Sequence, residues 1–195
     1  MKTDIILAGV GGQGILTIAA IIGVAAVNKK MYLKQSEVHG MSQRGGDVQS
    51  NLRISEKPIY SDLIPKGQAD LILSVEPMEA LRYLPYLSKS GYLITNLVTF
   101  NNITDYPEEA RIFAEIEKLP RKVAIQADLI AKEIGSARAS NIVMLGAASS
   151  FLNLSIEDLE YGITSLFSKK GEEVVAMNIK ALHAGRDAAS QYLKK

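Results

Sequence analysis

The chain alternates between short, largely apolar runs and longer segments in which apolar residues recur every three or four positions. Short apolar runs bounded by turn residues predict strands, whereas the longer periodic segments predict helices. The predicted strands are Asp4–Ala8, Tyr32–Gln35, Val48–Ile54, Ala69–Val75, Gly91–Asn96 and Val123–Ala127. The predicted helices are Ile15–Asn28, Pro77–Leu87, Asp128–Ile134, Asn141–Leu152, Ile156–Phe167 and Glu172–Leu193.

Four of the predicted strands are short, apolar on both faces and followed by a helical segment. This order predicts a parallel sheet that helices cover on both faces. Val48–Ile54 differs because polar and apolar residues alternate in it, which predicts a strand near an edge with one solvated face. We therefore expect an α/β fold over residues 1–195: a single Rossmann-like domain with a mostly parallel sheet and a helical C-terminal third.

The stretch from Ile5 to Val27 contains no charged residue, and its length alone could cross a bilayer or form part of a signal peptide. Glycines at positions 9, 11, 12 and 14 interrupt it. They divide the stretch into a strand-like piece, Ile5–Ala8, and a helix-like piece, Ile15–Val27. We therefore interpret the stretch as a buried strand, turn and helix of a cytoplasmic protein without a membrane segment.

The glycines form the pattern G-x-G-x-x-G from Gly9 to Gly14, between the first strand and the first helix. Such glycines permit a tight turn, and the start of the following helix offers free N–H groups to an anion. The lysine of a phosphate-binding loop is replaced by Ile15, which argues against an NTP hydrolase. Three interpretations remain open: close helix packing alone, an anionic cofactor or substrate, and NAD(P).

Residues 36–46 form a polar, glycine-broken segment after the second strand. Glu37 lies about where a dinucleotide fold places its ribose-binding acid, but a crossover helix should follow, and this segment is a poor helix former. Arg44 could hold a phosphate or carboxylate, and His39 could transfer a proton near neutral pH. Alternatively, the segment is only a solvated connection.

Composition narrows the chemistry that the chain can perform. The formal net charge is +1, so no strong field directs the protein to nucleic acid or an anionic membrane. The chain has no cysteine, which excludes cysteine-ligated iron–sulfur clusters, thiolate zinc sites and thiol nucleophiles. Two histidines are too few for a polyhistidine metal centre. We expect that the chain itself carries no redox centre and binds no metal.

Several motifs together resemble the small subunit of 2-oxoacid:ferredoxin oxidoreductases, and within that family the branch acting on indolepyruvate. The motifs are Gly9-x-Gly11-Gly12-Gln13-Gly14, Ser36-Glu37-Val38-His39-Gly40-Met41-x-Gln43-Arg44-Gly45-Gly46, Glu76-Pro77-x-Glu79-Ala80-Leu81-Arg82, Asn141-x-x-x-Leu145-Gly146-Ala147 and the pair Asn178 and Gly185. They extend over essentially the whole chain, and their combination is far more specific than one glycine motif.

The resemblance implies a division of labour between subunits. Thiamine diphosphate, magnesium and iron–sulfur clusters would lie on a large partner subunit, and ferredoxin would be reached through the complex. Coenzyme A would enter near the small subunit as co-substrate. The complex would convert a 2-oxoacid such as indolepyruvate to an acyl-CoA, and this chain alone would be inactive. Another 2-oxoacid, or a self-sufficient NAD(P)-dependent enzyme, is the alternative.

The resemblance also selects the residues that would border a ligand or the partner. These are Gly11, Gly12, Gln13, Gly14, Glu37, His39, Gln43, Arg44, Glu76 and Asn96. Of these, only His39 and Arg44 are weak catalytic candidates. Simpler roles stay open: Gln13 could only stabilise the turn, Glu76 could only favour the helix after Pro77, and Asn96 could only end a strand. Asn141, outside this group, is expected to be an N-cap.

Overall fold

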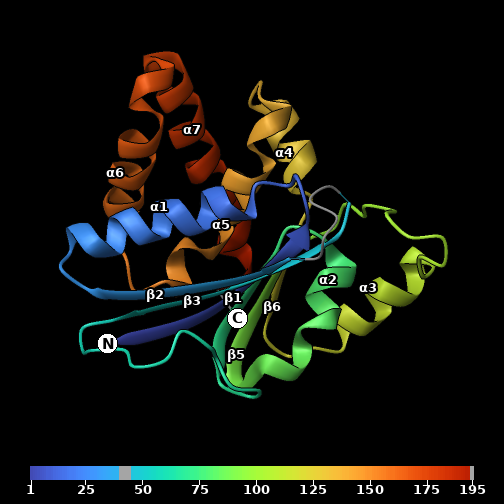
Figure 1. The fold of residues 1–195 in the computed structure, drawn as a ribbon. Coiled ribbons are helices and arrows are strands. Elements are labelled where there is room, and N and C mark those ends of the chain that lie inside the picture. The colour runs from blue at the N-terminus through green and yellow to red at the C-terminus, as the bar shows by residue number, and fades with distance from the viewer. Residues whose placement is uncertain (40–44, 194–195) are drawn as a thin grey trace.

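The computed structural model describes residues 1–39 and 45–193, apart from the side chain of His39. A six-stranded sheet runs through its centre (Figure 1). The strands are β1 (Lys2–Val10), β2 (Tyr32–His39), β3 (Asp47–Ser55), β4 (Ala69–Ser74), β5 (Leu87–Asn96) and β6 (Lys122–Ile125). Their order is β2-β3-β1-β4-β5-β6; β1, β4, β5 and β6 are parallel, and β3 is antiparallel to both neighbours. The predicted α/β fold with a mostly parallel sheet is confirmed.

Helices cover both faces of the sheet (Figure 1). One face packs against α1 (Ile15–Asn28), α4 (Ala127–Glu133), α5 (Ser140–Ala148), α6 (Ile156–Phe167) and α7 (Glu172–Ala189). The other packs against α2 (Pro77–Arg82) and α3 (Glu109–Glu117). Short 3-10 turns are η1 (Leu84–Tyr86), η2 (Ala137–Ala139), η3 (Ser149–Phe151), η4 (Ser168–Lys170) and η5 (Ser190–Tyr192). The helical C-terminal third is confirmed and lies on the α1 face.

The uncharged N-terminal stretch forms β1, the glycine turn and most of α1, as predicted. The side chains of β1 from Ile5 to Ala8 are fully buried, because helices cover both faces of this central strand. Within residues 1–39 and 45–193, no helix combines the length and the apolar character that crossing a membrane requires. The lack of charge in β1 therefore reflects burial inside the protein, whereas Leu16 and Val27 of α1 are exposed.

The second and third strands differ from the prediction. β2 continues to His39, so the first four residues of the polar segment are strand, and β2 rather than β3 is the edge. β3 lies next to that edge, but its predicted solvated face is wrong in part. Asn51 is buried there, because its side-chain oxygen accepts a hydrogen bond from the Ile64 N–H (3.2 Å) in the β3–β4 connection.

Helix boundaries also shift. α3 was not predicted; four of its nine residues are charged, and only Ile112 and Ile116 are buried. The helix that begins at Pro77 stops at Arg82 and continues as a 3-10 turn. α6 begins with a capping box: the Ser155 hydroxyl accepts the Asp158 N–H, and the Asp158 carboxylate accepts the Ser155 N–H.

Helices α5 and α7 meet closely through two glycines. A Cβ atom on Gly185 would lie 1.9 Å from the Val143 carbonyl oxygen, and one on Gly146 would lie 2.0 Å from the Leu182 carbonyl oxygen. Both obstacles are backbone atoms, which cannot rotate away. The two helices therefore reach their observed separation only because neither position carries a side chain.

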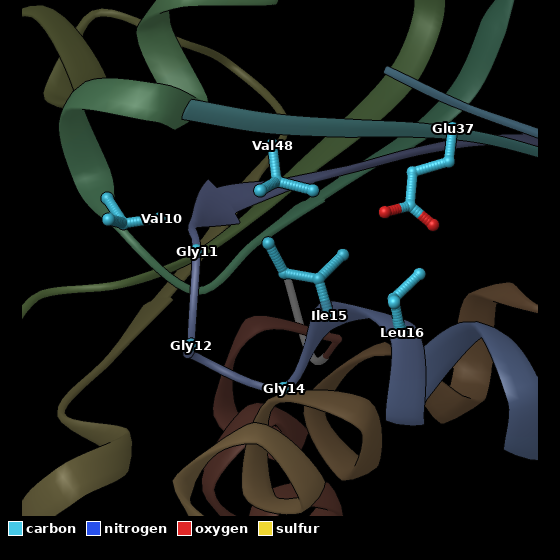
Figure 2. Close-up of a pocket in the computed structure, with 8 residues that line it drawn as sticks. All are labelled: Val10, Gly11, Gly12, Gly14, Ile15, Leu16, Glu37 and Val48. Atoms are coloured by element: carbon cyan, nitrogen blue, oxygen red, sulfur yellow. The ribbon is translucent and has the colours of Figure 1, made fainter. Parts of the chain in front are cut away.

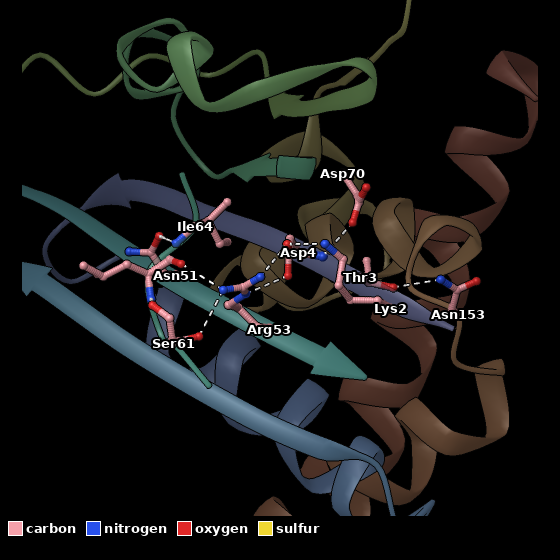
Figure 3. A network of polar contacts seen from close by, with 10 residues as sticks. Lys2, Thr3, Asp4, Asn51, Arg53, Ser61, Ile64, Asp70 and Asn153 are labelled. Carbon is pink, nitrogen blue, oxygen red and sulfur yellow. Dashed lines mark hydrogen bonds and ion pairs between the residues drawn. The ribbon is translucent and has the colours of Figure 1, made fainter. Parts of the chain in front are cut away.

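The Asp4 carboxylate on β1 is fully buried beside β3 (Figure 3). Asp4 on β1 accepts hydrogen bonds from Arg53 Nε (2.8 Å) and a second Arg53 nitrogen (3.0 Å), and from Lys2 Nζ (2.7 Å). Arg53 also donates to the Ser61 carbonyl oxygen (3.0 Å) and to the Leu63 carbonyl oxygen (2.9 Å). The arginine thus neutralises a buried charge and fixes the β3–β4 connection with one side chain.

Candidate functional site

The glycine turn joins β1 to α1 and is held from inside the chain. The Val10 N–H donates to the Gln13 side-chain oxygen (2.8 Å), and the Gln13 N–H donates to the Val10 carbonyl oxygen (3.1 Å). Gly12 and Gly14 have φ angles of 101° and 78°, in the left-handed region that favours glycine. Gln13 therefore closes the turn with its amide, which is the simpler of the two roles considered for it.

A cavity of about 450 Å³ opens beside this turn (Figure 2). It is lined by Val10, Gly11, Gly12, Gly14, Ile15, Leu16, Glu37 and Val48. The turn and the first residues of α1 form one wall, and Glu37 extends from β2 on the other. The first N–H groups of a helix lack intrahelical partners and attract negative charge. The cavity thus places the N-terminus of α1 opposite the Glu37 carboxylate.

The glycines of the motif have different functions. A Cβ atom on Gly9 would lie 2.4 Å from Val75 Cγ2, so Gly9 serves packing. A Cβ atom on Gly14 would lie 2.4 Å from Asn141 Nδ2, so Gly14 admits that side chain. Among the described residues, a Cβ atom on Gly12 would meet no atom within 4 Å. Gly12 is therefore the position where the turn presents bare backbone to open space.

Asn141 supports the turn from the C-terminal half of the chain. Its side-chain amide donates to the Gly14 carbonyl oxygen (3.1 Å), and it is the second residue of α5. The prediction that Asn141 is an N-cap is wrong, because α5 begins one residue earlier and Ala139 occupies the cap position. A polar residue with a long-range partner is indistinguishable from a cap at the level of sequence.

Glu76 is fully buried at the end of β4 and has three donors. Its carboxylate accepts the Glu79 N–H (2.8 Å), the Phe100 N–H (3.3 Å) and the Tyr106 hydroxyl. It caps α2 and ties the segment after β5 to the sheet. These contacts account for its burial, so the geometry favours a structural role over direct contact with a ligand.

Asn96 is likewise a connector. Its amide donates to the Asp128 carboxylate (2.7 Å), and its side-chain oxygen accepts the Ala127 N–H (3.0 Å). It therefore links the end of β5 to the start of α4. Its side chain is buried and its main partners come from α4, so Asn96 does not line the cavity beside the glycine turn.

The structure thus brings together part of the predicted set. Gly11, Gly12, Gly14 and Glu37 line one cavity, whereas Gln13, Glu76 and Asn96 hold the surrounding backbone. Gln43, Arg44 and the His39 side chain lie outside the described residues, and their predicted roles stay predictions.

One residue of the surrounding scaffold was missed at the level of sequence. Asn102, in the segment after β5, donates to the Gly45 carbonyl oxygen (2.8 Å). The Gly45 N–H donates in turn to the Gly11 carbonyl oxygen (3.4 Å), and the Gly11 N–H donates to the Gly46 carbonyl oxygen (2.8 Å). Asn102 therefore acts on the turn through a chain of contacts, and its irregular segment carries no periodic signal that would have revealed it.

Two observations bear on cofactors. β2 runs antiparallel into β3 through residues 40–46, which are too few for the crossover helix of a dinucleotide fold and disfavour NAD(P). In the part of the chain that the structure describes, no group of three or more His, Asp or Glu side chains could hold a metal ion.

We expect Glu76 and Tyr106 to be energetically coupled. Glu76→Gln and Tyr106→Phe should each destabilise the protein, and a double-mutant cycle in urea unfolding should give a coupling energy of about 1.5–3 kcal/mol, the range for a hydrogen bond to a charged group. Glu108→Gln, at an exposed position, is the control. Additive effects of Glu76→Gln and Tyr106→Phe would contradict the structural role of this pair.

The same pair predicts a dependence on alkaline pH. Burial, and next the Glu76 carboxylate, raise the pKa of Tyr106 above its ordinary value of 10.0. Above pH 10 the unfolded chain releases this proton while the folded protein retains it, so stability falls as pH rises. Tyr106→Phe should make that fall less steep, whereas Tyr60→Phe, at a 95% exposed position, should not.

The fold and the cavity together define an α/β protein with a glycine turn that borders a cavity at the start of its first helix. The family model described as pyruvate ferredoxin/flavodoxin oxidoreductase matches residues 4–188, and the chain belongs to this family. The chain is therefore a small subunit of a multi-subunit oxidoreductase of this family.

Similar proteins include several archaeal subunits. The chain is 36% identical to the indolepyruvate oxidoreductase subunit IorB of Archaeoglobus fulgidus, over 97% of this chain and 96% of that one. It is 37% identical to the IorB subunit of Pyrococcus horikoshii, over 97% of each chain. It is 29% identical to the 2-oxoglutarate synthase subunit KorC of Methanothermobacter marburgensis, over 96% of each.

Solved structures share the fold. The pyruvate oxidoreductase subunit PORC of Thermotoga maritima superposes with a TM-score of 0.73 at 21% identity, over 95% of this chain and 96% of that one. The 2-oxoglutarate:ferredoxin oxidoreductase of Magnetococcus marinus superposes with a TM-score of 0.75 at 23% identity. The match covers 97% of this chain but 31% of that chain, which is much longer.

Proposed function

We propose that this chain is the small subunit of an arylpyruvate:ferredoxin oxidoreductase, with indolepyruvate as the representative substrate. One observation carries the substrate class: identity is 36–37% to four archaeal IorB subunits over nearly the whole chain. It is 29% to the KorC subunit and 27% to a ketoisovalerate oxidoreductase subunit. The assembled enzyme would decarboxylate the 2-oxoacid, pass two electrons to ferredoxin and release an acyl-CoA.

The composition of the chain supports a division of labour with a large subunit. With no cysteine it cannot ligate an iron–sulfur cluster through thiolates. We assign thiamine diphosphate, magnesium and the clusters to the large subunit, where they supply the decarboxylation and electron-transfer chemistry. The small subunit would shape and close the active centre.

We assign the cavity beside the glycine turn to the face that borders coenzyme A or the partner. The start of α1 and the open backbone at Gly12 suit a phosphate group. Glu37 on the opposite wall suits a hydroxyl or amine donor and would repel a second anion. An elongated ligand with a phosphate at one end and hydrogen-bond donors farther along its length would match these two walls of the cavity.

The test is reconstitution with the large subunit from the same organism. The mixture should reduce ferredoxin with indolepyruvate and coenzyme A, and each subunit alone should be inactive. Turnover should be greater with indolepyruvate than with 2-oxoglutarate or pyruvate. Turnover by the purified chain alone, or a preference for 2-oxoglutarate, would contradict the proposal.

A matched pair of glycine variants tests the assignment of the cavity. Gly12 and Gly171 have nearly equal φ angles, 101° and 103°, and both face open space. Gly12→Val and Gly171→Val should therefore introduce similar backbone strain. Only Gly12→Val should raise the KM for coenzyme A or weaken assembly of the complex. Equal effects of the two variants would contradict the assignment of the glycine turn to the face that borders the ligand.

A further inference from the structure

The two edges of the sheet are built differently. β6 has four residues, and its Ala124 carbonyl oxygen accepts a hydrogen bond from the Tyr192 hydroxyl (2.6 Å). β2 has eight residues and pairs with β3 in unbroken register from Tyr32 to His39. It contains no proline, and its charged residues are Lys34 and Glu37. Natural proteins protect edge strands by shortening, bulges, proline or charge. Among the described residues, β6 is shortened and covered, whereas β2 is long and regular and is protected only by these two charges.

An apolar groove of about 500 Å³ follows the β2 edge. Its walls include Ala20, Val24 and Val27 from α1, Leu33 and Gln35 from β2, and Tyr161 from α6. α1 contains no charged residue along its whole length, and Val27 is 59% exposed. An apolar helix flank and a bare strand edge lie side by side here, which is the arrangement expected of a covered surface.

We propose that β2 pairs antiparallel with β2 of a second copy of this chain, about a two-fold axis at Gln35. In this register Tyr32 lies opposite the second copy's Val38, and the symmetry repeats this pair at the other end. Both side chains are exposed in the single chain, 49% for Tyr32 and 57% for Val38. Aromatic and β-branched residues directly opposite each other stabilise antiparallel pairs.

Neighbouring registers are less favourable because side chains on the same face of the sheet must be paired. A shift of the axis to Lys34 places the two lysines opposite each other, and a shift to Glu37 does the same with the two glutamates. Like charges in such positions are destabilising. An axis at Ser36 places Tyr32 opposite position 40, beyond the end of β2, and so removes the Tyr32–Val38 pair. The axis at Gln35 avoids both like-charge pairs and pairs all of Tyr32–Val38.

The proposed pairing has a consequence for the cavity beside the glycine turn. Glu37 lines that cavity and would lie opposite the second copy's Leu33. The α1 helices of the two copies would flank the joined edges on the same face of the sheet, because β2 presents Leu33, Gln35 and Glu37 to the face on which α1 packs. The second copy would thereby contribute a wall next to each cavity.

The absence of cysteine permits a direct test by disulfide trapping. In the proposed register the Gln35 Cα atoms of the two copies are about 4.5–5.5 Å apart, within the disulfide range of about 4.4–6.8 Å. Ser36 lies opposite Lys34, so its two copies are diagonal neighbours about 7–8 Å apart. Under mild oxidation Gln35→Cys should form a covalent dimer rapidly, while Ser36→Cys and the remote Lys169→Cys should form it slowly.

A second measurement keeps the test independent of oxidation. The native chain should behave as a dimer in light scattering after gel filtration, and Val38→Lys should shift it to monomer. A monomeric native chain, or cross-linking at Ser36→Cys as fast as at Gln35→Cys, would overturn the proposal. So would exclusive cross-linking of Gln35→Cys to the large subunit in the assembled enzyme. Ferredoxin reduction by the reconstituted native complex is measured separately, so failure of the β2 pairing and failure of the proposed function give different results.

Discussion

Gly185→Ala should destabilise the protein by about 3 kcal/mol or more, although alanine is the better helix former. Helix propensity alone predicts a gain of about 1 kcal/mol for this change in the middle of α7. The added Cβ atom, however, would lie 1.9 Å from the Val143 carbonyl oxygen of α5. Relief requires the two helices to separate, and overpacking of this kind costs up to about 3 kcal/mol and occasionally more.

The sign of the change therefore distinguishes packing from propensity. Urea unfolding followed by circular dichroism measures it directly. Gly146→Ala, on the other side of the crossing, should give a similar loss. Asp187→Ala, at an exposed position on α7, should change stability by less than about 0.5 kcal/mol. A stabilised Gly185→Ala variant would show that the α5–α7 contact is looser than described.

Arg53→Ala should destabilise the protein by about 3–5 kcal/mol, because it leaves the Asp4 carboxylate buried without its main partner. The variant also removes the donors to the Ser61 and Leu63 carbonyl oxygens. The β3–β4 connection should then exchange its amide hydrogens faster. Chemical unfolding gives the first quantity, and hydrogen exchange gives the second.

Two further variants serve as controls for this prediction. Lys2→Ala removes the other ion pair of Asp4, but the Lys2 side chain is 49% exposed, so the loss should be below about 1 kcal/mol. Adding Asp4→Asn to Arg53→Ala removes the unpaired charge and should recover part of the loss. If Lys2→Ala lowered the stability as much as Arg53→Ala does, burial of the Asp4–Arg53 pair would not explain the contribution of this pair to stability.

Elements with a local signal were predictable from the sequence. β1, α1 and α6 match their predicted positions closely, because apolar periodicity and a capping pair such as Ser155 and Asp158 lie within the element itself. α3 was missed although Ile112, Phe113 and Ile116 recur at helical spacing, because the helix is short and four of its nine residues are charged. The end of β2 was missed because an edge strand buries little of its surface and therefore resembles a polar loop.

The candidate site was likewise predictable only where its signal is local. The glycine turn and Glu37 are close to each other because β2 returns beside α1, and their residue types already indicated an anion-binding turn. The supports of the turn were not predictable. Asn141 reaches Gly14 across 127 positions of sequence, and the donors to Glu76 come from Phe100 and Tyr106. Such partners depend on the packing of segments that are distant in the sequence, and local sequence patterns do not reveal this packing.

The contact between Gly14 and Asn141 has a consequence for biosynthesis. The carbonyl of Gly14 receives its partner only after 127 further residues have been translated. At ordinary elongation speeds this interval is on the order of 10 s. Throughout it, the apolar first helix has neither α5 nor α6 to pack against and must wait on the ribosome with its surface uncovered. Newly made chains should therefore need chaperone protection early, and a truncation before position 141 should leave the turn unfinished.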